Sequence, residues 1–380
     1  MLNDVKEMKK NAAFVCGIKK SSYLCTVKQN KETTMIKGYS FNLATRFGSD
    51  YKIPIAVYDN VESFEYELNL YEKDYGALTK WNELVKNIER YYNGDNEAFL
   101  LDYYNVRDKI ITTTLDSNIY KQFITCKDPT DMIVDDTVLK YREKEHPTPK
   151  YSSGIYNQES IGKHFVSIDL RNANFQALKY VYVINGDTYR DFLAQFCSGF
   201  MLDYISESKY SRQVIFGKLN AKRTVTIEKL LVKKIYYIVK DEHNYMGTLL
   251  YFGSDELIFS YDDTIDMNAF LSSLRERMQK EGLDVRIEDY VLEGYEFFVK
   301  KADSTEHKLG EFYHRSCDSG GKYKGMPLPY HKILTKLMRD ETPTDIDKEL
   351  MYEKVRVRMI DDIVIKKRGW KSVFDIFRKK

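Results

Sequence analysis

Three acidic residues stand where short apolar runs of this sequence end. The run 165–168 ends in Asp169, and the run 248–252 leads through Gly-Ser into Asp255 and Glu256. Carboxylates that meet at neighbouring strand ends provide the hard oxygen ligands that Mg²⁺ takes together with substrate phosphates. Asp169, Asp255 and Glu256 therefore predict a Mg²⁺ or Mn²⁺ site for two-metal phosphoryl transfer. The alternative is that all three are turn residues, because acids are common in such connections.

A cluster of basic residues lies between these two acidic positions. Residues 209–240 hold nine basic side chains and one acid, Glu228, although the whole chain has 59 basic and 57 acidic residues. A solvated helix face usually mixes both signs, so the cluster favours binding of triphosphate or of a nucleic-acid backbone. Gly217 within it would let a ligand approach the backbone closely.

The strands and helices that would position these residues can be predicted from the sequence. The stretch between Pro149 and Pro327 contains no proline, and it predicts a strand, two helices, a strand hairpin, a helix and two further strands. Helices expected over 224–240 and 266–282 would cover one face of the sheet with their apolar side. The other face would remain free for a substrate.

The order of these motifs resembles the palm of template-directed polymerases. Ser254-Asp255-Glu256 followed by apolar residues is similar to the third motif of family A DNA polymerases. The sequence from Asp169 to Phe175 resembles the first motif, and Arg212 to Gly217 resembles the Lys-x-x-x-Phe-Gly of the fingers helix. The resemblance covers about residues 160–300 and implies that Asp169, Asp255 and Glu256 bind the metal ions. The nucleotide-binding residues that it implies, together with the basic cluster, are Asn174, Lys209, Arg212, Phe216, Gly217, Lys218, Asn220, Lys222 and Arg223.

Two departures from family A bear on the sugar and the layout. Asn174 and Asn220 stand where that family has the Glu and Tyr that exclude ribonucleotides. The short segment between Gly217 and Asp255 resembles the compact layout of reverse transcriptases and RNA-dependent RNA polymerases, although their Tyr-x-Asp-Asp and Gly-Asp-Asp sequences are absent from the hairpin. The Ser-Asp-Glu hairpin is also similar to that of the tRNA-His guanylyltransferase family, whose Asp-Gly-Arg motif is replaced here by Asp-Leu-Arg.

The sequence predicts an α+β protein of three parts with a right-hand, polymerase-like architecture. Residues 1–150 are expected to form an α+β domain with strands at 12–18, 23–29 and 53–59 and a helix over 75–93. Residues 151–310 would form an antiparallel palm, covered by helices on one face, with reduced fingers inserted at about 185–245. Residues 311–380 would form a helical, thumb-like subdomain with helices over 330–341 and 347–367 and a basic tail.

Composition and targeting signals limit the partners and the compartment. Five scattered cysteines without a CxxC pair predict reduced thiols, and no apolar stretch long enough to span a membrane occurs in the sequence. We therefore expect a cytoplasmic protein. The tail 366–380 holds seven basic residues and could bind nucleic acid, dock on a protein partner or touch an anionic membrane surface.

The function expected from these features is template-directed nucleic-acid polymerisation, with template, primer and nucleoside triphosphates as partners. Two alternatives remain open. The chain could be a non-templated nucleotidyltransferase, or a catalytically idle palm that binds nucleic acid as a scaffold.

Overall fold

The computed structural model describes residues 36–142, 144–151, 154–242, 247–261, 266–317, 320–352 and 355–369. The helices are α2 (Phe41–Tyr51), α3 (Val61–Leu70), α4 (Glu72–Tyr75), α5 (Ala77–Tyr92), α6 (Asn96–Asp116), α7 (Asn118–Thr125), α8 (Asp136–Leu139), α9 (Ala173–Tyr180), α10 (Tyr189–Leu193), α11 (Gly199–Glu207), α12 (Lys209–Lys218), α13 (Ala221–Glu242), α14 (Met267–Lys280) and α15 (His331–Met338). The strands are β1 (His164–Leu170), β2 (Leu249–Phe252), β3 (Glu256–Tyr261), β4 (Val285–Lys300), β5 (Glu306–Cys317), β6 (Gly320–Lys324), β7 (Glu349–Tyr352), β8 (Val355–Arg358) and β9 (Asp362–Arg368). Within these ranges no helix is both long enough and apolar enough to cross a membrane.

A large antiparallel sheet forms the centre of the fold. Its strands lie in the order β2-β3-β1-β4-β5-β6, and β9 pairs with β4. The first four strands and their helices follow the β-α-β-β-α-β order of a ferredoxin-like unit, in which the first strand lies between the third and the fourth. The expected order of strand, helices, strand hairpin, helix and two strands between Pro149 and Pro327 is confirmed, except that five helices, α9 to α13, lie between β1 and β2 where two were expected. Since this topology supports many unrelated functions, it does not itself assign one.

Helices α13 and α14 cover one face of this unit, as expected. Strand residues that alternate toward them, such as Val166, Ile168 and Leu257, belong to the same buried cluster as Leu231 and Leu274 of the two helices. Alternation with a period of two in the strands and apolar spacing of three and four in the helices produce this packing.

The other face of the sheet is only partly free. Phe165, Ile258 and Tyr290 point to this side and pack with Ile155 and Ile161, which come from the segment before β1. Apolar packing therefore covers this face around the start of β1. Polar side chains occupy the end of the sheet where β1 finishes.

The C-terminal part differs from the expected helical thumb. Strand β5 crosses the expected boundary at residue 310, and a third buried cluster joins the far half of β4 and β5 to α15 and β9. The helix over 330–341 is confirmed as α15, whereas 347–367 forms β7, β8 and β9 instead of a helix. The β-branched alternation of Val355 and Val357, and the Ile-Val-Ile sequence of β9, explain the strands.

In the described residues before 150, the regular secondary structure consists of helices only, so the expected α+β domain is not found there. The helix expected over 75–93 is confirmed as α5, but 53–59 is not a strand. Ile53, Ile55 and Val57 are buried alternately in extended chain that has no pairing strand in the described residues. The other two expected strands, at 12–18 and 23–29, lie outside the described residues.

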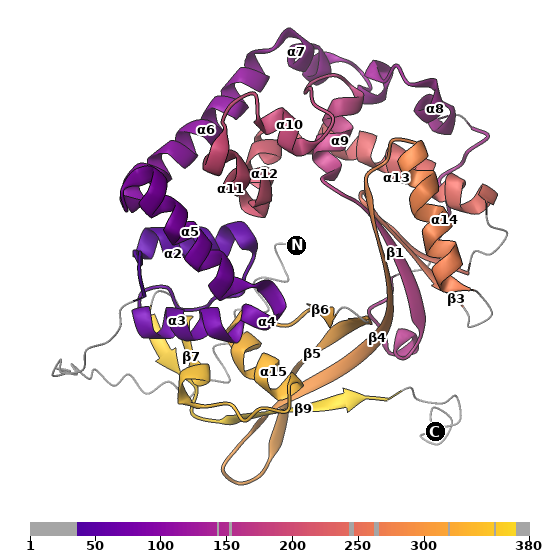
Figure 1. Cartoon of the computed structure of the whole chain (residues 1–380). Coiled ribbons are helices and arrows are strands. Elements are labelled where there is room, and N and C mark those ends of the chain that lie inside the picture. The colour runs from indigo at the N-terminus through magenta and orange to yellow at the C-terminus, as the bar shows by residue number, and fades with distance from the viewer. Residues whose placement is uncertain are drawn as a thin grey trace, which may run out of the picture.

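The elements are arranged as a ring (Figure 1). The N-terminal helices form one side, the ferredoxin-like unit forms the opposite side, and the long strands β4 and β5 run toward the C-terminal elements. These elements return to the N-terminal helices, where Lys332 of α15 pairs with Glu67 of α3 at 3.0 Å and Tyr71 contacts His331.

Candidate phosphoryl-transfer site

The structure brings Asp169 and Asp255 together at one end of the sheet. Asp169 lies in β1, and Asp255 lies in the turn between β2 and β3, the strand next to β1. The backbone N–H of Leu170 donates to the Asp255 carbonyl at 2.7 Å, which fixes the turn against the end of β1. The sequence prediction that these strand ends meet is confirmed.

Three carboxylates and two guanidinium groups, those of Arg286 and Arg315, lie at this end of the sheet. Arg286 of β4 donates to Asp169 Oδ2 at 2.8 Å. Burial raises the pKa of Asp169, and the charges of Glu256 and Asp255 raise it further, whereas Arg286 lowers it. At Asp169, burial and the two acidic neighbours therefore outweigh the effect of Arg286 on the pKa.

Glu256 has protein partners of its own. Its Oε1 accepts from Arg315 at 2.8 Å and from the Ser167 hydroxyl at 2.6 Å, and Arg315 is only 5% exposed. Burial alone would raise the pKa of Glu256, but the hydrogen bond and charge of Arg315 outweigh it, so the pKa lies below its usual value. The expected role of Glu256 as a metal ligand remains a prediction, and in this structure its carboxylate is part of a buried ion pair.

The carboxylates at this end of the sheet do not form a complete metal site by themselves. In the described part of the chain, no three side chains of His, Cys, Asp or Glu gather as a ready-made metal site. Asp169 and Asp255 nevertheless supply the one or two carboxylates with which Mg²⁺ binds when substrate phosphates complete its shell. The residues present thus fit a metal ion that arrives with its nucleotide, and not one held by the protein alone.

Cations from distant segments surround the acidic end of the sheet. Lys209 and Arg212 come from α12, Lys52 follows α2, and Lys324 ends β6. Across the described residues none of these four pairs with an acid within ion-pair distance. Partial burial lowers the pKa of Lys209, and the positive charges of Arg212, Lys52 and Arg286 lower it further, whereas Asp169 opposes this. Partial burial and the charge of Arg315 likewise lower the pKa of Lys324, and Glu256 opposes them. Excess positive charge of this kind favours an anionic ligand.

A buried carboxylate holds the start of α12 in place. Asp50 of α2 is 0% exposed and accepts from the hydroxyls of Tyr103, Tyr204 and Ser208 at 2.9, 2.8 and 2.7 Å. Ser208 is also the N-cap of α12, because its side chain accepts from Ser211 N. This network fixes the helix end that carries Lys209.

Glu228, which was not among the site residues expected from the sequence, is buried close to them. This residue of α13 is 3% exposed, and its carboxylate accepts from the side-chain amide of Asn174. Burial raises the pKa of Glu228 to about 7, the hydrogen bond from Asn174 opposes this, and Asp255 adds to it. The signal was present in the sequence, since Glu228 is the one acid within the basic cluster.

Several residues expected to bind a nucleotide have other roles. Arg223 donates to the Cys126 carbonyl at 2.6 Å and lies over the Phe123 ring, so it joins α13 to the N-terminal helices. Phe216 is 1% exposed in the main core. Asn220 forms the left-handed turn between α12 and α13 with φ of 60°. Phe216 is thus engaged in the core and Arg223 in a contact between helices, whereas Asn220 is exposed and its contact with a nucleotide stays a prediction.

Of the other residues expected to bind a nucleotide, some lie at the acidic end of the sheet and others are exposed to solvent. Asn174 lies beside Glu228, as described above. Gly217 is exposed, and a Cβ built on it would meet no atom within 4 Å. Lys218 and Lys222 are exposed as well. Lys218 is the last residue of α12, about 9 Å along the helix axis from Arg212, and Lys222 lies in α13.

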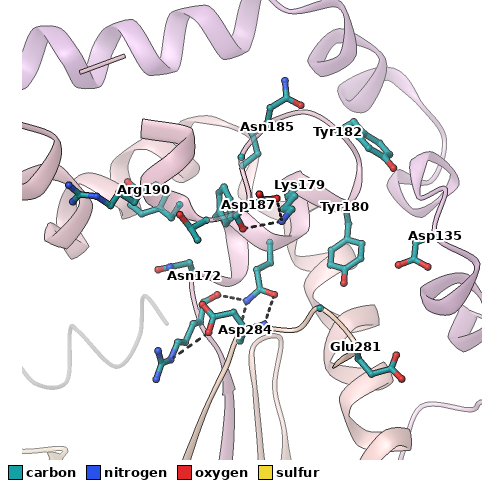
Figure 2. Close-up of a pocket in the computed structure, with 18 of the residues that line it drawn as sticks. Asp135, Asn172, Lys179, Tyr180, Tyr182, Asn185, Asp187, Arg190, Glu281 and Asp284 are labelled. Atoms are coloured by element: carbon teal, nitrogen blue, oxygen red, sulfur yellow. Dashed lines mark hydrogen bonds and ion pairs between the residues drawn. The ribbon is translucent and has the colours of Figure 1, made fainter. Parts of the chain in front are cut away.

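A pocket of about 1320 Å³ opens next to the end of β1 (Figure 2). Arg171 and Asn172, which directly follow β1, form part of its wall, and Gln176 closes its floor. The Gln176 amide donates to the carbonyls of Arg171 and Asp284 at 2.6 and 2.7 Å, which ties β1 to the start of β4. The sequence analysis did not anticipate this pocket.

Comparisons with protein-family models, with curated proteins and with solved structures found no match to this chain. The functional argument therefore depends on the geometry of the site.

The basic tail is described only as far as residue 369. Lys366, Lys367 and Arg368 lie in β9 and pair with Glu306, Glu293 and Glu311 of β4 and β5. These three residues are therefore engaged within the sheet. The rest of the tail, 370–380, lies outside the described residues.

Proposed function

We propose that this protein is a magnesium-dependent nucleotidyltransferase of the template-directed polymerase type, with its reaction centre at Asp169 and Asp255. The observation that carries the proposal is the meeting of these two carboxylates, at adjoining ends of β1 and the β2–β3 turn, with cations that have no acidic partner within the described residues. Carboxylates and free cations at one place are what the metal-bound triphosphate of a nucleotide requires.

Each group has a separate task in this proposal. Asp169 and Asp255 hold magnesium, which when bound supplies positive charge at the transferred phosphoryl group. Lys209 and Arg212 bind triphosphate oxygens from α12, and their position is set by the Asp50 network. The protein needs no nucleophile of its own, because alignment of the incoming hydroxyl and charge neutralisation provide the rate enhancement.

Primer extension by the purified full chain tests this function. DNA and RNA templates are each offered dNTPs or rNTPs with Mg²⁺ or Mn²⁺, and template-complementary extension is expected. Asp255→Asn should reduce incorporation by at least about 100-fold while the fold is retained, because the change removes charge from an exposed turn residue.

Asp340→Asn is the matched control. Asp340 is exposed and has a left-handed backbone that Asn adopts as readily as Asp. It should extend primers like the unaltered protein. Incorporation that persists in Asp255→Asn would remove Asp255 from the reaction.

A catalytically idle scaffold is the second candidate. It is favoured by the arginine partners of Asp169 and Glu256, which neutralise both carboxylates without a metal ion. That function predicts salt-sensitive nucleic-acid binding without extension under any of these conditions. A non-templated nucleotidyltransferase, in contrast, would extend an end whatever the template sequence.

A further inference from the structure

The pocket beside β1 has no net charge on its walls. Its four basic residues are matched by four acidic ones. Lys179 lies 3.8 Å from Asp187, and Arg171 lies 3.9 Å from Asp284. The pocket therefore differs from the cation-rich end of the sheet, and its charge does not favour phosphate groups.

Aromatic rings and amides make up much of the remaining wall. Tyr180 and Tyr182 lie on one side of the pocket, and Asn172 lies on the other (Figure 2). The side-chain amides of Asn172 and Asn185 make no hydrogen bond to any part of the chain that the structure describes. Stacking surfaces with free amide donors and acceptors are what an unpaired nucleobase needs.

Tyr182 has an unusual backbone for such a large side chain. It has a φ of 57°, and it follows α9 as the left-handed residue of a Schellman turn. The N–H of Tyr182 donates to the Lys179 carbonyl at 3.0 Å, and that of Val183 donates to the Leu178 carbonyl at 3.0 Å. Glycine usually occupies this position because a Cβ is strained there. The tyrosine is nevertheless 56% exposed, so burial of its ring does not compensate for the strain.

A second tyrosine in the wall has an unsatisfied hydroxyl. Tyr189 is 4% exposed, and its hydroxyl has no hydrogen-bond partner among the described residues. A buried unpaired hydroxyl is costly, and an ordered water or a ligand at the wall would satisfy it. Nearby, Gly186 has a φ of 133°, and a Cβ there would lie 2.7 Å from Phe192 N, so the loop is held tightly against α10.

We propose that this pocket binds a nucleobase that stacks on Tyr182, at the junction of the N-terminal helices and the sheet. The assignment rests on the proposed function, because that function brings nucleic acid to Asp169, two residues before Arg171. The base comes either from a single strand that leads to the site or from a free nucleoside. At about 1320 Å³ the pocket exceeds the size of ordinary small-ligand sites, which favours the strand.

The test uses 2-aminopurine, a base analogue whose fluorescence is quenched by stacking. Single-stranded DNA and RNA oligonucleotides with 2-aminopurine at successive positions, and free 2-aminopurine riboside, are titrated into the full chain. We expect quenching at one or two adjacent positions of the oligonucleotide. Quenching of the riboside with equal affinity would identify a free nucleoside as the ligand instead.

Variants of Tyr182 separate stacking from folding. Tyr182→Phe should keep the quenching, whereas Tyr182→Gly should abolish it and raise Kd about 5- to 100-fold, the range expected for one stacked base. Because glycine suits the turn, Tyr182→Gly should melt at the same temperature as the unaltered protein or higher. Tyr91→Ala, which removes another exposed tyrosine on α5, should leave quenching unchanged.

The outcomes distinguish this inference from the proposed function. Quenching that depends on Tyr182 and persists in Asp255→Asn supports the pocket even if incorporation is lost. No quenching with any probe, or equal quenching in Tyr182→Gly, overturns the pocket assignment while primer extension can still succeed.

Discussion

Glu228 shows how a single residue can join the core to the candidate site. It is buried on α13 beside the turn that carries Asp255, and its hydrogen bond comes from Asn174 at the start of α9. A contact of Asn174 with the sugar, which the sequence resemblance implies, stays a prediction. Asn174 would not act alone in such a contact, since its amide is already engaged by Glu228.

The pKa of Glu228 predicts a specific dependence of stability on pH. Burial raises this pKa to about 7, above the usual 4.5, so the folded state binds a proton that the unfolded state has lost. The favourable contribution of the protonated Glu228 to the free energy of unfolding is fully present below pH 4.5 and is lost as pH rises to about 7. Glu228→Gln should therefore match the unaltered protein near pH 4.5 and be more stable by about 2–3 kcal/mol at pH 8.

Urea unfolding at several pH values measures this difference. The informative quantity is the free energy of unfolding of Glu228→Gln minus that of the unaltered protein, because other titrating groups cancel. A difference that does not change between pH 4.5 and pH 8 would contradict a raised pKa for Glu228.

The positions of the candidate site residues could be predicted from the sequence where the local pattern determines them. Asp169 and Asp255 follow apolar runs, and Lys209 and Arg212 share one face of a short helix, so their positions follow from nearby sequence, while their roles stay predictions. Glu256 and Arg223 have partners 59 and 97 residues away, Arg315 and Cys126 respectively. Such tertiary contacts leave no local signal in either segment.

Helix α12 is the element that carries cations to the site. Its start is fixed by the Asp50 network, and Lys209 and Arg212 are one turn apart on the same face. Gly217 is unusual in the last turn of such a helix, because glycine lowers helix stability. A side chain would fit at this position, since a Cβ built there meets no atom within 4 Å. A ligand that approaches the backbone would explain it.

Gly217→Ala should therefore have opposite effects on stability and on activity. The methyl group has free space in the unliganded protein, so the free energy of unfolding should rise by about 0.5–1 kcal/mol. Incorporation should fall, through a higher KM for the nucleotide. Thermal melting and steady-state kinetics measure the two effects, and an alanine variant with unchanged KM would show that no ligand approaches this backbone.

The C-terminal strands show why whole elements were predicted wrongly. Residues 347–367 have the charged and apolar composition of a helix, but β9 is stabilised by pairing with β4, with Gly294 opposite Arg368 and Lys300 opposite Asp362. Pairing over such a distance in sequence depends on tertiary context, which propensity does not contain. In the central unit each strand pattern agrees with its neighbours, so its order was predicted correctly.

At the scale of the whole molecule, the ring is closed by polar contacts between distant parts of the chain. Lys332 of α15 and Glu67 of α3 are 2% and 0% exposed at their side chains. Arg339 donates to the Leu70 carbonyl at 3.1 Å, and burial lowers the pKa of nearby His331 to about 4, which keeps it neutral. This junction connects the C-terminal elements to the helices that position α12.

The buried pair predicts how the ring opens. Lys332→Met should leave Glu67 as an unpaired buried charge and destabilise the protein by about 3–5 kcal/mol, whereas adding Glu67→Gln should restore much of the loss. Lys348→Met is the control, because Lys348 pairs with Asp362, which is 73% exposed, and such pairs contribute less than about 1 kcal/mol. Urea unfolding gives the free energies, and hydrogen exchange of α3 and α15 shows whether the junction opens first. Equal losses in the two lysine variants would mean that the Glu67–Lys332 pair does not hold the ring closed.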